Sequence, residues 1–116
     1  MSKSNKLFIS RYNDFYGCLL TKHQCEMIRL YYDCDISLFE IAEQFDISRL
    51  AVRDTIKRAE NLLEDYETKL GLSKKFLKMQ EVMLQLENAI DNNDIDNSKK
   101  SLNLLKEILE DNDGDI

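Results

Sequence analysis

Apolar residues in this chain recur at alternating intervals of three and four positions, which is the period of an amphipathic helix. The longest such run has intervals of 4, 3, 4, 3 and 4 between residues 52 and 70. Its apolar positions are Val52, Ile56, Ala59, Leu63, Tyr66 and Leu70. Gly71 follows directly, and glycine is a common residue at the C-terminus of a helix. The pattern therefore predicts one helix of about 22 residues, which is long for a small domain.

Shorter runs with the same spacing predict further helices before and after the long one. Gly17 lies near the end of the first, where we expect a left-handed closing residue. The predicted inner faces are Phe8, Tyr12, Phe15 and Leu19; Cys25, Ile28 and Tyr32; Leu38, Ile41, Ala42 and Phe45; Phe76, Met79, Met83, Leu86 and Ile90; and Ile95, Leu102, Leu105 and Leu109. A polar turn at residues 92–94 separates the last two runs. The chain is thus predicted to be all-α, with about six helices.

Polar residues that cap helices mark where several of these helices begin. Residues 21–24 (Thr-Lys-His-Gln) and 37–40 (Ser-Leu-Phe-Glu) both have the capping-box form Ser/Thr-x-x-Glu/Gln. Ser48 is a natural N-cap for the long helix, and Ser73 is one for the helix that follows it. These caps fix the expected helix starts independently of the apolar spacing.

The composition agrees with a helical fold and limits the partners. Leucine outnumbers valine 17 to 2, and the chain has three glycines and no proline, which suits helices and argues against an all-β domain. A net charge of −6 argues against a protein that coats nucleic acid by bulk electrostatics. Residues 1–58 carry nine basic and eight acidic side chains, whereas residues 59–116 carry seven and fourteen. We therefore expect a polyanionic partner to bind the N-terminal half.

The chain lacks the residues that most enzyme and metal sites require. His23 is the only histidine, and the three cysteines form no Cys-x-x-Cys pair, so we expect neither a zinc site nor a Cys–His nucleophile. No glycine-rich phosphate loop is present. No apolar run approaches the roughly 20 residues of a membrane helix, and no secretory signal follows Met1. We expect a non-enzymatic, cytoplasmic protein with reduced thiols, no cofactor, no small-molecule substrate and no membrane insertion.

Residues 37–58 have the plan of a helix-turn-helix motif. A short capped helix is followed by a joint of a few residues and by the longer helix that starts at Ser48. Such a pair of helices cannot bury its own apolar faces, so flanking helices must cover it. We predict a helix-turn-helix domain over residues 1–72, a C-terminal helical extension over residues 73–111 and a frayed tail over residues 112–116.

Basic residues at the beginning of the long helix form the candidate nucleic-acid site. At 100° per residue, Arg49, Arg53 and Lys57 lie at about 0°, 40° and 80°, beside the apolar seam. Farther along, the same flank carries Glu60, Glu64 and Glu67. Only the beginning of a recognition helix enters a major groove, so this order of charge favours DNA binding. The residues predicted to contact nucleic acid are Ser48, Arg49, Arg53, Lys57 and Arg58. The spacing also allows a solvated basic face on a protein-binding helical module.

Five sequence blocks are informative together: residues 20–24 (LTKHQ), 31–32 (YY), 37–43 (SLFEIAE), 47–58 (ISRLAVRDTIKR) and 66–72 (YETKLGL). In combination they resemble the YlxM family of small helix-turn-helix proteins of Gram-positive bacteria, whose central part is similar to region four of bacterial sigma factors. The match runs from about Leu7 to Leu72, and the helical extension has the size usual in the family. One departure is Asp46, because the turn of such motifs commonly has glycine. Aspartate tolerates a left-handed conformation better than most side chains, so we expect the turn to form.

The resemblance implies a cytoplasmic, non-enzymatic regulator linked to the signal recognition particle pathway. The favoured interpretation is a helix-turn-helix DNA-binding regulatory protein of that pathway. The alternative is a protein-binding adaptor that modulates the targeting GTPases or their ribonucleoprotein without binding DNA, since the acidic half suits basic protein surfaces. The 3–4 spacing along residues 52–70 and 76–90 also predicts a homodimer formed through these long amphipathic helices.

Overall fold

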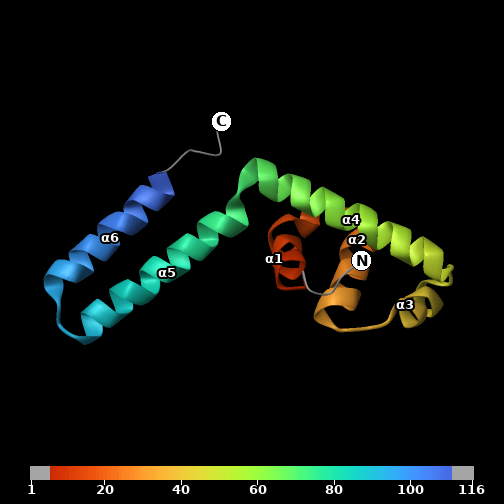
Figure 1. Ribbon diagram of the computed structural model, residues 1–116, viewed down its shortest axis with the longest axis horizontal. Helices are drawn as coiled ribbons and strands as arrows, with labels where there is room; N and C mark the ends of the chain where they lie inside the picture. The colour runs from red at the N-terminus through yellow and green to blue at the C-terminus, as the bar shows by residue number, and fades with distance from the viewer. Residues whose placement is uncertain (1–5, 111–116) are drawn as a thin grey trace. The chain divides into compact units, whose positions relative to one another are not determined.

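The computed structural model describes residues 6–110, and this part of the chain contains helices and no strand (Figure 1). The elements in chain order are α1 (Lys6–Tyr16), the 3₁₀ turn η2 (Gly17–Leu19), α2 (Lys22–Ile28), the π-helical turn η3 (Arg29–Asp33), α3 (Leu38–Phe45), α4 (Arg49–Leu70), α5 (Leu72–Asp91) and α6 (Ile95–Glu110). The all-α prediction with six helices is confirmed. The frayed tail predicted at residues 112–116 lies outside the described residues.

The helices divide into two compact units, and the division falls between Lys69 and Leu70. The first unit contains α1 to α3 and nearly all of α4, and the second contains α5 and α6. None of the described helices is both long enough and apolar enough to cross a membrane.

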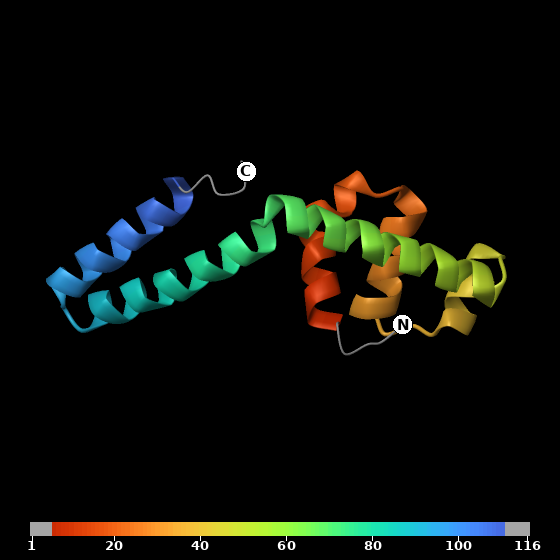
Figure 2. The ribbon, with the colours of Figure 1, turned by 45° about the horizontal axis from the view of Figure 1, so that its top comes forward.

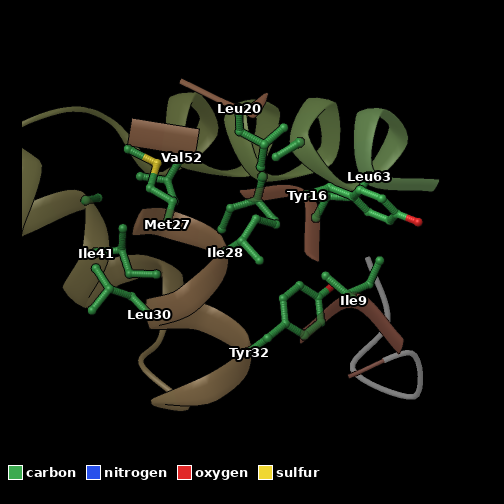
Figure 3. Close-up of a cluster of buried hydrophobic side chains, with 13 residues drawn as sticks. Ile9, Tyr16, Leu20, Met27, Ile28, Leu30, Tyr32, Ile41, Val52 and Leu63 are labelled. Atoms are coloured by element: carbon green, nitrogen blue, oxygen red, sulfur yellow. The ribbon is translucent and has the colours of Figure 1, made fainter. Parts of the chain in front are cut away.

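The core of the first unit is built on one face of α4. Val52, Ile56, Ala59 and Leu63 of α4 are all fully buried, as the 3–4 spacing predicts. The remaining buried members of this core are Ile9, Tyr16, Leu20, Met27, Ile28, Leu30, Tyr32, Ile41 and Ala42. Figure 3 shows such side chains converging from the short helices onto α4. The core therefore fixes the rotation of α4 about its own axis.

The predicted inner face of the first helix is half correct, because Tyr12 and Phe15 are partly buried against the core as predicted. Phe8 and Leu19 are exposed, and the buried residues of this segment are Ile9, Tyr16 and Leu20. The α-helix ends at Tyr16 and continues as the 3₁₀ turn η2. A 3₁₀ turn advances by about 120° per residue and not 100°, so the α-helical spacing cannot be extended to Leu19.

Gly17 has a different role from the predicted left-handed closing residue. Among the described residues, Gly71 is the glycine that has a positive φ angle. Gly17 is buried and does not have a positive φ angle. A Cβ atom at Gly17 would lie 2.9 Å from Asn13 Oδ1 and 2.9 Å from Cys25 Sγ. Gly17 therefore allows α2 to pack closely against the end of α1.

Most of the predicted caps form as expected. The amide of Gln24 donates to Thr21 Oγ1 over 3.1 Å, and the amide of Thr21 donates back to Gln24 Oε1 over 3.0 Å. The Ser37–Glu40 capping box forms in the same way at the start of α3. Ser73 is an exception, because α5 begins two residues earlier than predicted, with Gly71 as its N-cap (φ 65°), and Ser73 lies buried inside the helix.

The second unit is a hairpin in which α5 and α6 run antiparallel, side by side (Figure 2). The predicted polar turn at residues 92–94 connects them, and Asp94 caps α6 by accepting a hydrogen bond from the amide of Asn97 over 3.1 Å. The prediction that Phe76, Met83 and Ile90 face inward is wrong, since all three are exposed. Small side chains occupy the helix contact instead, because they allow two helices to approach closely.

Candidate nucleic-acid interface

The turn between α3 and α4 is held by local hydrogen bonds and by one left-handed residue. Asp46 ends α3 with φ 56° and ψ 47°, as the sequence predicts for this joint. Its amide donates to the carbonyl oxygens of Ala42 and Glu43, which closes the last turn of α3. Ser48 then caps α4, since its Oγ accepts a hydrogen bond from the amide of Ala51 over 3.0 Å. These contacts set where α4 begins relative to α3.

Core packing decides which side chains of α4 face solvent at its beginning. Val52 and Ile56 are fully buried, so the residues on the other sides of these turns point outward. The five predicted site residues, Ser48, Arg49, Arg53, Lys57 and Arg58, are all exposed. None of these side chains is therefore occluded by the rest of its own unit.

Two of the predicted residues, Arg49 and Arg53, line one groove. The groove has a volume of about 600 Å³ and lies between η3, the beginning of α3 and the beginning of α4. Its lining residues are Tyr31, Ser37, Leu38, Phe39, Arg49, Leu50 and Arg53. Lys57 and Arg58 do not line it, because they lie farther along α4. The structure thus brings together the two arginines nearest the start of the helix.

The groove combines positive charge with exposed apolar side chains. Leu50 is 65% exposed and Phe39 is 54% exposed, although both are large and apolar. Sequence reasoning missed Phe39 and Tyr31 as groove residues. The sequence did contain a signal for Phe39. Phe39 is a large aromatic residue, and it does not belong to the inner face of the short helix, which Leu38, Ile41 and Ala42 form. Such a surface can contact a ligand that offers both acidic and apolar groups.

The two groove arginines make no ion pair or side-chain hydrogen bond with any part of the chain that the structure describes. Asp54 is exposed on α4 and Asp46 is exposed in the turn, but neither is paired with Arg49 or Arg53. Lys57 lies near Glu60, and its positive charge opposes the rise in the pKa of Glu60 that burial causes. The positive charge at the start of α4 is therefore available to a ligand, whereas Lys57 is partly balanced.

The acidic flank that follows is not a uniform solvated surface. Glu60 is partly buried and accepts a hydrogen bond from the hydroxyl of Tyr32. Glu67 is also partly buried and accepts one from the hydroxyl of Tyr16 over 2.6 Å. Glu64 is the exposed member of the three. The order of charge along α4 is as predicted, but two of the three carboxylates anchor buried tyrosines.

The histidine and the cysteines lie apart from the groove at the start of α4. Residues 6–110 contain no cluster of three or more His, Cys, Asp or Glu side chains that could hold a metal ion. His23 is exposed and its ring lies edge-on to Phe45, with 5.2 Å between ring centroids. Cys18 and Cys34 are exposed free thiols, and Cys25 is partly buried. The groove at the start of α4 combines two arginines with exposed apolar side chains.

Comparison with known proteins points to the same motif. The family model UPF0122, described as "Putative helix-turn-helix protein, YlxM / p13 like", matches residues 2–108. A UPF0122 protein of Desulforamulus reducens is 45% identical over 106 residues, which cover 88% of this chain and 91% of that protein. A UPF0122 protein of Halalkalibacterium halodurans is 55% identical over 78 residues, 67% of this chain and 72% of that protein. A UPF0122 protein of Bacillus thuringiensis is 52% identical over 77 residues, which cover 66% of this chain and 70% of that protein.

Proposed function

Because this chain belongs to the UPF0122 family of YlxM/p13-like helix-turn-helix proteins, we propose that it is a regulatory protein that binds duplex DNA through the first turns of α4. The observation that carries this proposal is the pair Arg49 and Arg53, which are exposed, lie in one groove and are unpaired within the described residues. An unpaired guanidinium binds phosphate or the edge of guanine without first giving up a partner.

Each predicted residue has a distinct role in this proposal. Arg49 and Arg53 enter the major groove, where each contacts a base edge or a phosphate. Ser48 and the free amides at the start of α4 face a phosphate, since a helix N-terminus carries partial positive charge. Lys57 and Arg58 lie farther along the helix and contact the backbone beside the groove. The binding domain is residues 1–72, the extension is residues 73–111, and a DNA ligand implies action in the cytoplasm.

Salt-dependent binding tests the proposal. Duplexes from a random pool are titrated with the wild-type protein and with Arg53→Ala at several salt concentrations. We expect log K to fall with log salt at a slope near −0.9 for each phosphate contacted. We expect Arg53→Ala to weaken binding at every salt concentration, and to make the slope shallower by about 0.9 where the lost contact is to a phosphate. Lys78→Ala on α5 is the matched control, because it removes one exposed positive charge outside the motif. Absent binding, or an Arg53→Ala variant that binds as tightly as the wild type at every salt concentration, would contradict the proposal.

A second candidate function is that of an adaptor in the signal recognition particle pathway, as the sequence resemblance implies. The apolar side chains of Phe39 and Leu50 favour it, because two exposed large residues beside two arginines also suit an acidic, amphipathic protein segment. Under this alternative the protein binds the purified targeting GTPases or their ribonucleoprotein, and duplex DNA does not compete. Direct binding measurements with each component, with and without competing duplex, separate the two functions.

A further inference from the structure

The α5–α6 hairpin has one strongly apolar face that its own packing does not cover. We define this apolar hairpin face by the residues Met79, Met83, Leu86, Ile90, Ile95, Leu102 and Leu109. Ile95 is 67% exposed, and Met83, Ile90 and Leu109 are also more than half exposed. Leu86, Ile90, Ile95 and Leu102 line a shallow cavity of about 460 Å³ on this face. The largest apolar side chains of the hairpin therefore lie outside the contact between its two helices.

Small residues make that contact, and the opposite side of the hairpin is polar. Val82 and Ala89 of α5 and Ser101 of α6 are buried. The groove on the other side has Gln85, Asn88, Asn92, Asn97, Lys100 and Leu104 among its lining residues. Because the two sides differ so strongly in polarity, the apolar hairpin face is a specific feature and not general surface hydrophobicity.

The two edges of this face carry opposite charges. On a helical wheel, Glu87 lies about 40–60° from Met83 and Ile90 at the outer edge of α5. Lys99 lies about 40–60° from Ile95 and Leu102 at the outer edge of α6. Both charged residues are six positions from Asn93 at the tip of the hairpin. They therefore stand at the same height on opposite edges of the apolar face.

We propose that this face binds the same face of a second copy, so that two hairpins form a four-helix bundle. A copy rotated by 180° about an axis parallel to the helices places its α5 over α6 and its α6 over α5. The rotation brings Glu87 of each chain opposite Lys99 of the other at equal height, so the surface is complementary to itself in charge as well as in polarity. The 3–4 spacing of Met79, Met83, Leu86 and Ile90 suits the packing of helices in such a bundle.

The sequence analysis predicted a dimer interface along residues 52–70 and 76–90. The structure excludes the first of these two segments. Val52, Ile56, Ala59 and Leu63 are fully buried within their own unit, so they are not available to a second chain. The stripe that begins at Phe76 remains open for pairing. The homodimer proposed here uses residues of the second unit alone, and it does not depend on the proposed DNA binding.

The test is the mass of the full-length protein in solution, in the absence of nucleic acid. Sedimentation equilibrium is expected to give twice the chain mass of 13.7 kDa for the wild type. Met83→Glu places a charge on the face and is expected to raise the dimer dissociation constant by about 30-fold or more. Leu84→Glu is the matched control, because Leu84 is the next residue, is 61% exposed and points away from the face. Circular dichroism of both variants verifies that the helices still form.

A charge exchange tests the orientation of the two copies. Glu87→Lys and Lys99→Glu are each expected to weaken the dimer, and the double variant is expected to restore it, because the exchange recreates the opposite-charge pairs. A wild-type protein that is still monomeric at about 100 μM overturns the proposal. Its dimer dissociation constant would then lie above about 100 μM, which is too weak for a specific interface. Equal effects of Met83→Glu and Leu84→Glu overturn it as well, because they would show that the apolar hairpin face is not the interface.

Discussion

Tyr32 of η3 donates its hydroxyl hydrogen to the carboxylate of Glu60 on α4, and this bond ties the turn after α2 to the long helix. Tyr16, at the end of α1, makes the equivalent bond to Glu67 two turns farther along α4. Both tyrosine rings are almost fully buried. Two buried rings with polar tips thus fasten α4 to α1 and to η3 at two separate points.

The first prediction concerns stability at alkaline pH. Burial, followed by the hydrogen bond to Glu60, raises the pKa of Tyr32 well above its usual value of 10. The unfolded chain ionises its tyrosines near pH 10, so stability from neutral Tyr32 is present below that pH and is lost as the pH rises above it. We expect the free energy of unfolding to fall steeply above pH 10.

Tyr32→Phe is the variant that checks this cause. It removes the ionisable group and is expected to make the alkaline decline shallower, while it costs about 1–2 kcal/mol at pH 7 through the lost hydrogen bond. Some decline remains, because burial and the neighbouring Glu67 and Glu64 also raise the pKa of Tyr12. Urea unfolding at pH 7, 10 and 11 measures both effects. The same alkaline slope in the variant and the wild type would refute the assignment.

The second prediction concerns Glu60, which accepts the hydrogen bond from Tyr32, at acidic pH. Burial raises the pKa of Glu60 above its usual value, although the Tyr32 hydroxyl opposes this shift. The folded state therefore binds the Glu60 proton more tightly than the unfolded state, and this contribution to stability is lost as the pH rises through the raised pKa. Glu60→Gln keeps an oxygen that accepts from Tyr32 and carries no charge. Urea unfolding between pH 4 and 7 is expected to show the variant gaining stability relative to the wild type as the pH rises, and a constant difference would contradict this.

The third prediction concerns the turn of the motif. Asp46 has positive φ at the end of α3 and places a negative charge near Arg49 and Arg53 in sequence. Asp46→Asn keeps a side chain that tolerates the left-handed conformation and removes the charge, so we expect it to tighten duplex binding about two- to five-fold at low salt. Asp46→Gly also relieves backbone strain and is expected to add about 1 kcal/mol of stability. Titrations at two salt concentrations measure the binding, and weaker binding by both variants would be inconsistent with a repulsive role for Asp46.

The predictable parts of this structure are those set by short-range chemistry. The Thr21 and Ser37 capping boxes, the left-handed Asp46 and the buried face of α4 each depend on residues within a few positions of one another, so the sequence pattern is sufficient. The beginning of α4 was predicted for the same reason, because Ser48 bonds to an amide only three residues away.

The features that could not be predicted depend on contacts between distant segments. Whether Ile9 or Phe8 faces the core depends on how α1 packs against α2 and η3, which are distant in sequence. The groove needs η3 and α3 to meet the first turns of α4, which no local pattern encodes. The hairpin contact was missed because small residues such as Ala89 score weakly in an apolar pattern, yet they allow two helices to approach.

The last prediction concerns which base the groove at the start of α4 recognises in a duplex. Leu50 lies between Arg49 and Arg53 in sequence, lines the same groove and is 65% exposed. An apolar side chain in a major groove contacts the C5-methyl group of thymine, which uracil lacks. In a duplex selected from a random pool, replacing the contacted thymine by uracil is expected to weaken wild-type binding by about 5-fold, or about 1 kcal/mol. Leu50→Ala is expected to bind both duplexes with the weaker affinity, because the methyl group then has no partner, whereas Leu84→Ala on α5 keeps the wild-type preference. If wild-type protein binds every uracil-substituted duplex as tightly as the thymine duplex while Arg53→Ala still weakens binding, then α4 contacts the DNA through its arginines and Leu50 lies outside the contact.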